Sequence, residues 1–165
     1  LCDLCHDGDG GDFCGMRDER FMRTALAEAG LSQKAGEVPV GAVIVKGEEI
    51  ISLSHNMTVK NKNSLAHAEM IAIGEASAKL GIERLTDCEL FVTLEPCAMC
   101  AGAILNSRLK RTVFGAYDPL NGFFGSVIDL LQYSTYKKTE VIGGVLEKEC
   151  REILRDFFDA MRKNK

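Results

Sequence analysis

Residues 91–104 read FVTLEPCAMCAGAI, an apolar run followed by a proline and a Cys-x-x-Cys pair. Proline suits the first turn of a helix, because its missing N–H would have no partner there. The run Leu90 to Thr93 therefore predicts a buried strand, and Cys97 to Ser107 predicts a helix that starts at its first cysteine. Cys97 and Cys100 are three apart and lie on one face of such a helix, so both sulfurs can reach a single metal ion.

The rest of the chain alternates between short apolar runs and helical stripes. Four further strands are expected, at Val38 to Val45, Ile50 to Leu53, Thr112 to Gly115 and Glu140 to Ile142. Three further helices are expected, at Phe21 to Ala29 with an end near Gly30 or Gly36, at Ala66 to Leu80, and at Leu146 to Met161. This alternation predicts an α/β fold, a three-layer α/β/α sandwich around a five-stranded mixed sheet.

The chain has the composition of one ordinary globular domain. Its 165 residues are 46% hydrophobic and 27% charged, and no run of about 18 apolar residues suggests a membrane span. The amino-terminal end lacks a signal-peptide pattern, and the odd number of seven cysteines fits a reducing cytoplasm. Residues 1–15 are rich in Gly and Asp, so we expect a flexible extension there and a folded domain at 16–165.

A second motif, His67-Ala68-Glu69, adds an imidazole and a carboxylate. With Cys97 and Cys100, His67 completes three ligands, the number in a catalytic zinc site that keeps its fourth position for water. Zinc lowers the pKa of such a water towards about 7. Glu69 is assigned to protons: it would take one from this water and deliver it to a departing amine. The two motifs in this order match zinc deaminases, which remove an exocyclic amine from a nucleobase.

Other interpretations of these motifs remain open from the residues alone. A Cys-x-x-Cys pair by itself can be a redox pair. A structural zinc site would need a fourth ligand, for which Cys88 or Cys150 is available. Both lie in apolar stretches, where cysteines are usually buried and inert.

The sequence around the two cysteines also resembles that of a known family. Residues 91–104 are similar to the bacterial TadA-type tRNA adenosine deaminases of the cytidine deaminase-like zinc superfamily. Further matching pieces are VPVGAVIV at 38–45, Asn56 eleven residues before His67, 113–116 with Asp118, Gly125-Ser126 and 156–158. The resemblance extends from about Asp18 to about Lys163, nearly the whole chain, and implies the cytidine deaminase-like fold.

This resemblance implies a zinc hydrolase that converts adenosine to inosine at the anticodon wobble position (34) of tRNA, with release of ammonia. It implies one Zn²⁺ per subunit, the tRNA anticodon stem-loop as partner, a homodimer and a cytoplasmic location. It also implies that a set of residues contacts the substrate: Asn56, Ala68, Asp118, Phe157 and Arg162.

The residue types suit contact with the substrate, but they also suit purely structural roles. An amide such as Asn56 offers a donor and an acceptor to a purine edge, and the Asp118 carboxylate can accept from a ribose 2′-hydroxyl. Asn56 could equally end a strand, Asp118 could form a surface turn and Phe157 could be core. Phe123 and Phe124 replace small residues often found in the family, and we expect exposed aromatics that stack on a nucleotide or close a dimer contact.

The formal net charge of −4 is unusual for an RNA-binding protein. Residues 1–15 hold four acidic and no Lys or Arg residues, however, so the remaining chain has 20 acidic against 20 basic residues. We therefore expect RNA contact from local basic patches. The candidates are Arg108-Lys110-Arg111, Lys137-Lys138 and Arg162-Lys163 with Lys165.

Two alternatives to a tRNA deaminase stay open. The first is a deaminase of a free base or nucleotide, of guanine or cytosine type, because zinc deaminase sites resemble one another. The second is a structural-zinc RNA-binding module, which would bind RNA without turnover.

Overall fold

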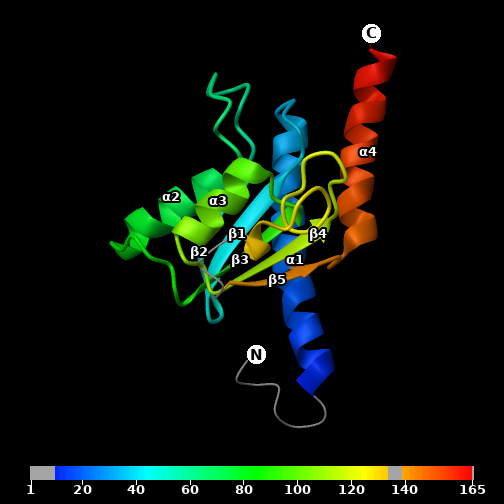
Figure 1. Cartoon of the computed structure of the whole chain (residues 1–165). Helices are drawn as coiled ribbons and strands as arrows, with labels where there is room; N and C mark the ends of the chain where they lie inside the picture. Colours follow the sequence, from blue (N-terminus) through cyan, green and yellow to red (C-terminus); the bar gives the residue numbers. More distant parts are fainter. Residues whose placement is uncertain (1–9, 134–138, 165) are drawn as a thin grey trace.

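The computed structural model describes residues 10–133 and 139–164, in which strands and helices alternate (Figure 1). The elements are α1 Gly10–Lys34, β1 Gly41–Lys46, β2 Glu49–His55, α2 Ala68–Leu80, β3 Cys88–Leu94, α3 Ala98–Asn106, β4 Arg111–Ala116, the 3₁₀ helix η1 Leu130–Gln132, β5 Glu140–Gly143 and α4 Glu147–Lys163. All five predicted strands and all four predicted helices are present.

The sheet has the strand order β2-β1-β3-β4-β5 and contains both strand directions. Strand β1 is antiparallel to β2 and β3, whereas β3, β4 and β5 are parallel to one another. At the centre, Val92 of β3 lies opposite Ala42 of β1 on one side and Phe114 of β4 on the other. A strand covered on both faces is apolar at consecutive positions, as β3 is at 90–92. The predicted five-stranded mixed sheet is confirmed.

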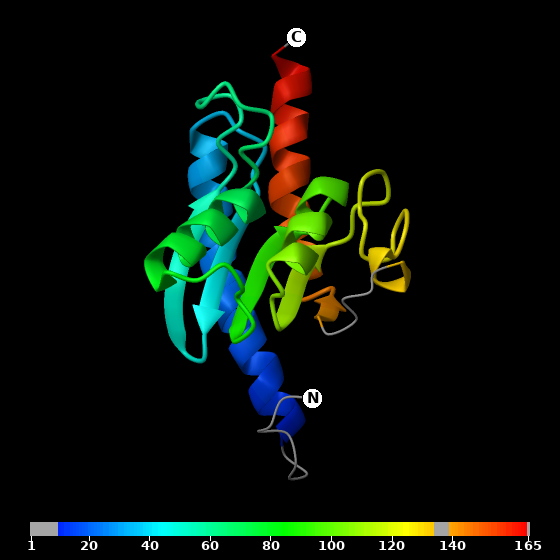
Figure 2. The ribbon, with the colours of Figure 1, turned by 60° about the vertical axis from the view of Figure 1, so that its left-hand side comes forward.

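Helices cover both faces of the sheet and complete the three predicted layers (Figure 1, Figure 2). Helices α2 and α3 lie on one face, and α1 and α4 lie on the other. Ala42 and Ile44 of β1 therefore pack in the core beside α2, whereas Val43 and Val45 pack beside α1. At the start of β1, the backbone of α1 comes so close that a Cβ on Gly41 would lie 1.9 Å from a carbonyl oxygen of that helix.

Helix α1 differs most from its predicted extent. The stripe predicts a start near Phe21 and an end near Gly30 or Gly36. Helix α1 starts earlier, at Gly10, passes through Gly30 and ends at Lys34, so the predicted end near Gly36 is confirmed. A helical glycine costs only about 1 kcal/mol relative to alanine, less than the packing of Met22 and Ala25 against the sheet provides. Residues 10–15, expected in a flexible extension, are therefore helical, and residues 1–9 lie outside the described part of the chain.

None of the helices seen in residues 10–133 and 139–164 has the length and apolar character needed to cross a membrane.

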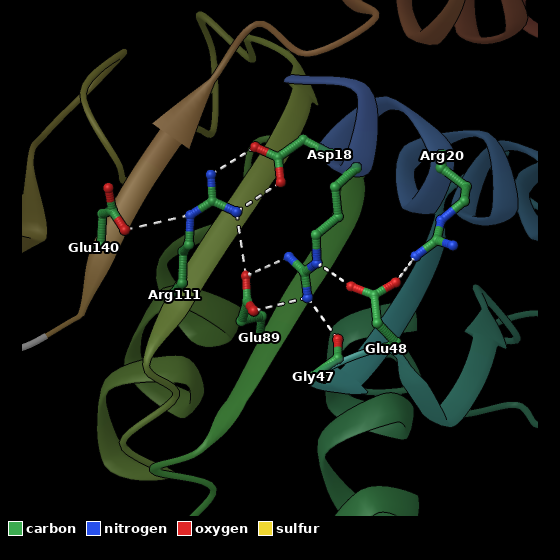
Figure 3. A network of polar contacts seen from close by, with 8 residues as sticks. Asp18, Arg20, Gly47, Glu48, Glu89, Arg111 and Glu140 are labelled. Atoms are coloured by element: carbon green, nitrogen blue, oxygen red, sulfur yellow. Dashed lines mark hydrogen bonds and ion pairs between the residues drawn. The ribbon is translucent and has the colours of Figure 1, made fainter. Parts of the chain in front are cut away.

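A cluster of ion pairs closes the end of the sheet at which β3 and β4 begin (Figure 3). Arg111 of β4 donates two hydrogen bonds to Asp18 of α1, at 2.6 and 2.7 Å, and one to Glu89 of β3 at 3.2 Å. Arg17 of α1 donates two more to Glu89, at 3.0 and 3.1 Å. The Arg111 side chain is only 7% exposed. The expectation that Arg111 belongs to an RNA-binding patch was wrong, because its side chain is buried and its guanidinium group pairs with Asp18, Glu89 and Glu140.

Candidate active site

The cysteine and histidine motifs meet at the opposite end of the sheet, where β3 and β4 end. Helix α2 begins directly after His67 and helix α3 directly after Cys97, so both helix N-termini lie at this end. The motifs border a pocket of about 550 Å³, of which His67, Glu69 and Cys97 line one part. The segment 117–126 after β4, here termed the rim loop, contributes five residues to the lining, at 117–121.

Three side chains in this region form a group suited to a metal ion. The His67 Nδ1 atom lies 3.7 Å from Cys97 Sγ and 3.6 Å from Cys100 Sγ, and the three donor atoms lie within 4.8 Å of one another. Such a triangle can surround one zinc ion, whose bonds to nitrogen and sulfur are about 2.0–2.3 Å long. Within the described residues no fourth His, Cys, Asp or Glu joins the group. Cys88 and Cys150, the candidates for a structural site, are buried in the core.

The protein distributes protons unequally between the two cysteines. A hydrogen bond with Cys100, together with one to His67, lowers the pKa of the Cys97 thiol to about 4. The same contact with Cys97, followed by burial, raises the pKa of Cys100 above its ordinary value. Cys97 also stands at the N-cap of α3, where the helix dipole favours a thiolate. One sulfur is thus prepared as a thiolate, and a bound divalent cation would displace the proton of the other.

Glu69 lies in the first turn of α2 and lines the same pocket. It is 4% exposed, and this burial raises the pKa of its carboxyl to about 7, despite the opposing influence of His67. A carboxyl group with a pKa near neutrality can both accept and return a proton. Its position and chemistry therefore suit the predicted proton carrier.

Comparison with known proteins agrees with this arrangement. Residues 16–116 match the family described as cytidine and deoxycytidylate deaminase zinc-binding region. The chain is 47% identical over 150 residues to the tRNA-specific adenosine deaminase of Bacillus subtilis, covering 90% of this chain and 93% of that protein. It is 43% identical over 149 residues to the tRNA-specific adenosine deaminase of Aquifex aeolicus, covering 90% and 99%. The chain belongs to the tRNA-specific adenosine deaminase family.

A solved structure supports the same grouping. It comes from studies of A-to-I editing by tRNA:A34 deaminases at the wobble position of transfer RNA, and it superposes with a TM-score of 0.79 at 41% identity. The match covers 82% of this chain and 99% of that one. The predicted deaminase family, its fold and its zinc cofactor are confirmed, and His67, Cys97 and Cys100 are positioned to hold the ion.

In this member of the tRNA-specific adenosine deaminase family, Asn56 connects the pocket to the start of α2. Its side-chain amide donates to the Val38 carbonyl at 3.1 Å, and its Oδ1 accepts from the Ala68 amide at 2.9 Å. This hydrogen bond satisfies the first backbone N–H of α2. The N-cap residue, His67, makes no side-chain hydrogen bond to the helix. An amide has a second N–H and a second lone pair for a base, and Asn56 lines the pocket. Ala68 is buried behind it and is not in the pocket lining.

The opposite wall comes from the rim loop and α4. Asp118 lines the pocket, and its carboxylate accepts from the amides of Leu120 and Asn121 at 3.0 and 3.1 Å, which fixes its orientation. Phe158 also lines the pocket and is 43% exposed, whereas Phe157 is 9% exposed and packs inside. Adjacent helical side chains differ in direction by about 100°. Phe158 is therefore the residue of this pair that lines the pocket, and the substrate contact predicted for Phe157 stays a prediction.

Other expected contacts lie away from the pocket wall. Arg162, near the end of α4, is 72% exposed at its side chain and pairs with Asp159. Phe123 and Phe124, expected to be exposed, pack against the core and anchor the rim loop instead. The basic pair at 137–138 lies outside the described residues.

Two buried carboxylates, Glu37 and Glu95, were not predicted from the sequence, and each of them lies beneath a loop. Glu37 is 1% exposed and accepts from the amides of Val59 and Lys60 at 3.1 and 2.8 Å, and from the Thr58 hydroxyl at 3.0 Å. Glu95 is 2% exposed and accepts from the rim loop. A signal was present, since Glu37 directly precedes an apolar run and Glu95 directly follows one. Acidic residues in such places are rarely buried without partners.

Proposed function

We propose that this protein converts adenosine to inosine at the wobble position of a tRNA anticodon, with water as co-substrate and ammonia as second product. One observation carries the proposal: a three-ligand zinc group and the buried Glu69 lie together in one pocket, in a chain from the tRNA-specific adenosine deaminase family. We further propose the anticodon stem-loop as the bound part of the tRNA, a homodimer as the assembly, and the cytoplasm as the location.

The reaction replaces the exocyclic amine on C6 of adenine with the oxygen of water. Zinc, when bound, acidifies water so that it becomes a nucleophile near neutral pH. Of the two protons of this water, one ends on N1 of the ring and the other leaves with the amine as ammonia. We assign both transfers to Glu69, because this residue lines the pocket and its pKa of about 7 suits acceptance and release of a proton.

The pocket wall supplies groups that suit a nucleotide of RNA. The second amide N–H of Asn56 can donate to the purine edge, and the Asp118 carboxylate can accept from a ribose 2′-hydroxyl. The exposed face of Phe158 can stack on a base, and Arg162 can contact a phosphate farther along the RNA. Ala68 and Phe157 would support these contacts from behind, as buried neighbours of Asn56 and Phe158.

The proposal is tested by replacing Glu69 with Gln in the zinc-loaded protein. General acid–base catalysis contributes about 10²- to 10⁴-fold, so turnover of an anticodon stem-loop RNA should fall by at least the lower figure while zinc content stays the same. Glu75→Gln, at an exposed position of α2, is the matched control. Inosine is measured by mass spectrometry and zinc by elemental analysis. RNA binding by a wild-type protein that makes no inosine would instead identify a binding module.

A further inference from the structure

The carboxylate of Glu95 is enclosed by the rim loop. Its Oε1 atom accepts from the amides of Phe124 and Ser126 at 3.1 and 3.0 Å. Its Oε2 atom accepts from the Asp118 amide at 3.0 Å and from the Ser126 hydroxyl. Each oxygen thus has two donors, which is about the capacity of a carboxylate oxygen. The group is fully engaged in holding the loop and has no role left as an acceptor from substrate.

The backbone of the rim loop follows this carboxylate closely. The Phe123 amide donates to the Pro96 carbonyl at 2.9 Å, and the Glu95 amide donates to the Ala116 carbonyl at 2.8 Å. A Cβ on Gly122 would lie 2.3 Å from the Glu95 carboxylate and 2.6 Å from the Asp118 carbonyl. Only a residue without a side chain allows the loop to approach this closely.

Glu95 also joins two parts of the pocket that are distant in sequence. It is two residues before Cys97, a member of the zinc group, and it bonds the amide of Asp118, which lines the pocket. The side chain therefore fixes the rim loop relative to the start of α3. Displacement of the loop would move the wall at 118–121 without removing any zinc ligand.

We propose that Glu95 is a positioning residue for the substrate: its buried carboxylate sets where the rim loop, and Asp118 on it, stands relative to the zinc group. This inference rests on the proposed function, because it assumes that the rim loop contacts the RNA beside the target base. It assigns to the Glu95 side chain an effect on substrate recognition, separate from the chemical step at Glu69.

The test compares Glu95→Gln with wild-type protein, both loaded with zinc, on an anticodon stem-loop RNA. Glutamine keeps the size but turns one acceptor into a donor that faces backbone N–H groups. A misplaced binding group can cost up to about a hundredfold, so KM should rise roughly ten- to hundredfold while kcat stays within about threefold. The zinc content should not change. Ser126→Ala, which removes one of the four donors, should give a smaller rise in KM.

Gly122→Ala adds a methyl group on the loop side of the same contact. This group would meet the Glu95 carboxylate and displace the loop, so KM should also rise. Because both changes act through one contact, the double variant should be less impaired than the product of the two single effects predicts. Glu37→Gln is the matched control, since it disturbs an equally buried carboxylate beneath a loop from which only Thr58 lines the pocket. Its KM should rise less than that of Glu95→Gln.

Three results would overturn the inference. An unchanged KM in folded Glu95→Gln would show that the loop position is unimportant, and a fall in kcat at constant KM would indicate a chemical role. Loss of zinc would mean that Glu95 acts on Cys97 instead. If Glu95→Gln does not fold, Ser126→Ala and Gly122→Ala decide the question. Absence of inosine with the wild-type protein would instead count against the proposed function.

Discussion

Each end of β3 holds a carboxylate with little solvent exposure, but the two ends compensate its charge in different ways. At the start of the strand, Glu89 lies between the guanidinium groups of Arg17 and Arg111 (Figure 3). Beyond the other end, Glu95 is held by backbone amides and a hydroxyl of the rim loop. The first arrangement, the ion pairs, joins helix α1 to strands β3 and β4. The second orients a loop that borders the pocket, so one end should govern stability and the other substrate recognition.

The largest effect is expected at the ion-pair end. Arg111→Met leaves Asp18 and Glu89 without their shared cation, and breaking a buried ion pair costs about 3–5 kcal/mol. The free energy of unfolding, measured with urea, should fall by this amount, while KM for the stem-loop RNA stays unchanged. Arg84→Met is the control, since its exposed pair with Glu83 should contribute no more than about 1 kcal/mol. Unaltered stability of Arg111→Met would remove the distinction between the two ends.

A smaller effect, in affinity, is expected at the pocket end. Phe158→Ala removes an aromatic face from the pocket wall, and stacking of a base on such a face contributes about 1–3 kcal/mol. KM should therefore rise while the free energy of unfolding changes little. Phe157→Leu should show the opposite pattern, because this neighbour is buried. Steady-state kinetics and urea unfolding of both variants provide the measurement, and equal KM values for the two would argue against the assignment of Phe158.

The smallest effect concerns the dependence of stability on pH. Burial alone would raise the pKa of Glu37, but hydrogen bonds from the loop at 58–60 outweigh it and lower the pKa below its ordinary value of 4.5. A lowered folded-state pKa contributes stability that is fully present above the unfolded-state pKa and is lost as the pH falls through the folded-state value. Glu37→Gln should therefore show a flatter loss of unfolding free energy below about pH 5. Parallel acid profiles for variant and wild type would contradict this account.

The fold and the zinc group could be predicted because their signals are local. Strand β3, the proline and the two cysteines follow one another within a few residues, and each zinc ligand stands beside a helix start that its own sequence indicates. The apolar runs are equally clear, since residues of β1 and β3 pack on both faces of the sheet. Such features depend on residue type and spacing, which a sequence displays directly.

The contacts of the rim loop, the ion pairs of Arg111 and the pocket side of α4 could not be predicted, because their signals are distant in sequence, lie in the backbone or depend on helical phase. Glu95 bonds residues up to 31 positions away, mostly through amide groups that every residue type except proline possesses. Arg111 resembled part of a basic surface patch until the fold placed Asp18, 93 positions away, against it. For Phe157 and Phe158, a difference of one residue in helical phase decides which side chain meets the pocket.

The pocket is proposed to deaminate adenosine within tRNA. The most direct measurement is to incubate the zinc-loaded protein separately with a tRNA that has adenosine at the wobble position and with free adenosine, guanine and cytidine. Mass spectrometry then quantifies inosine, xanthine and uridine. We predict inosine at the wobble position of the tRNA and no product from the free compounds. Product from a free base or nucleoside, with the tRNA unchanged, would contradict the account.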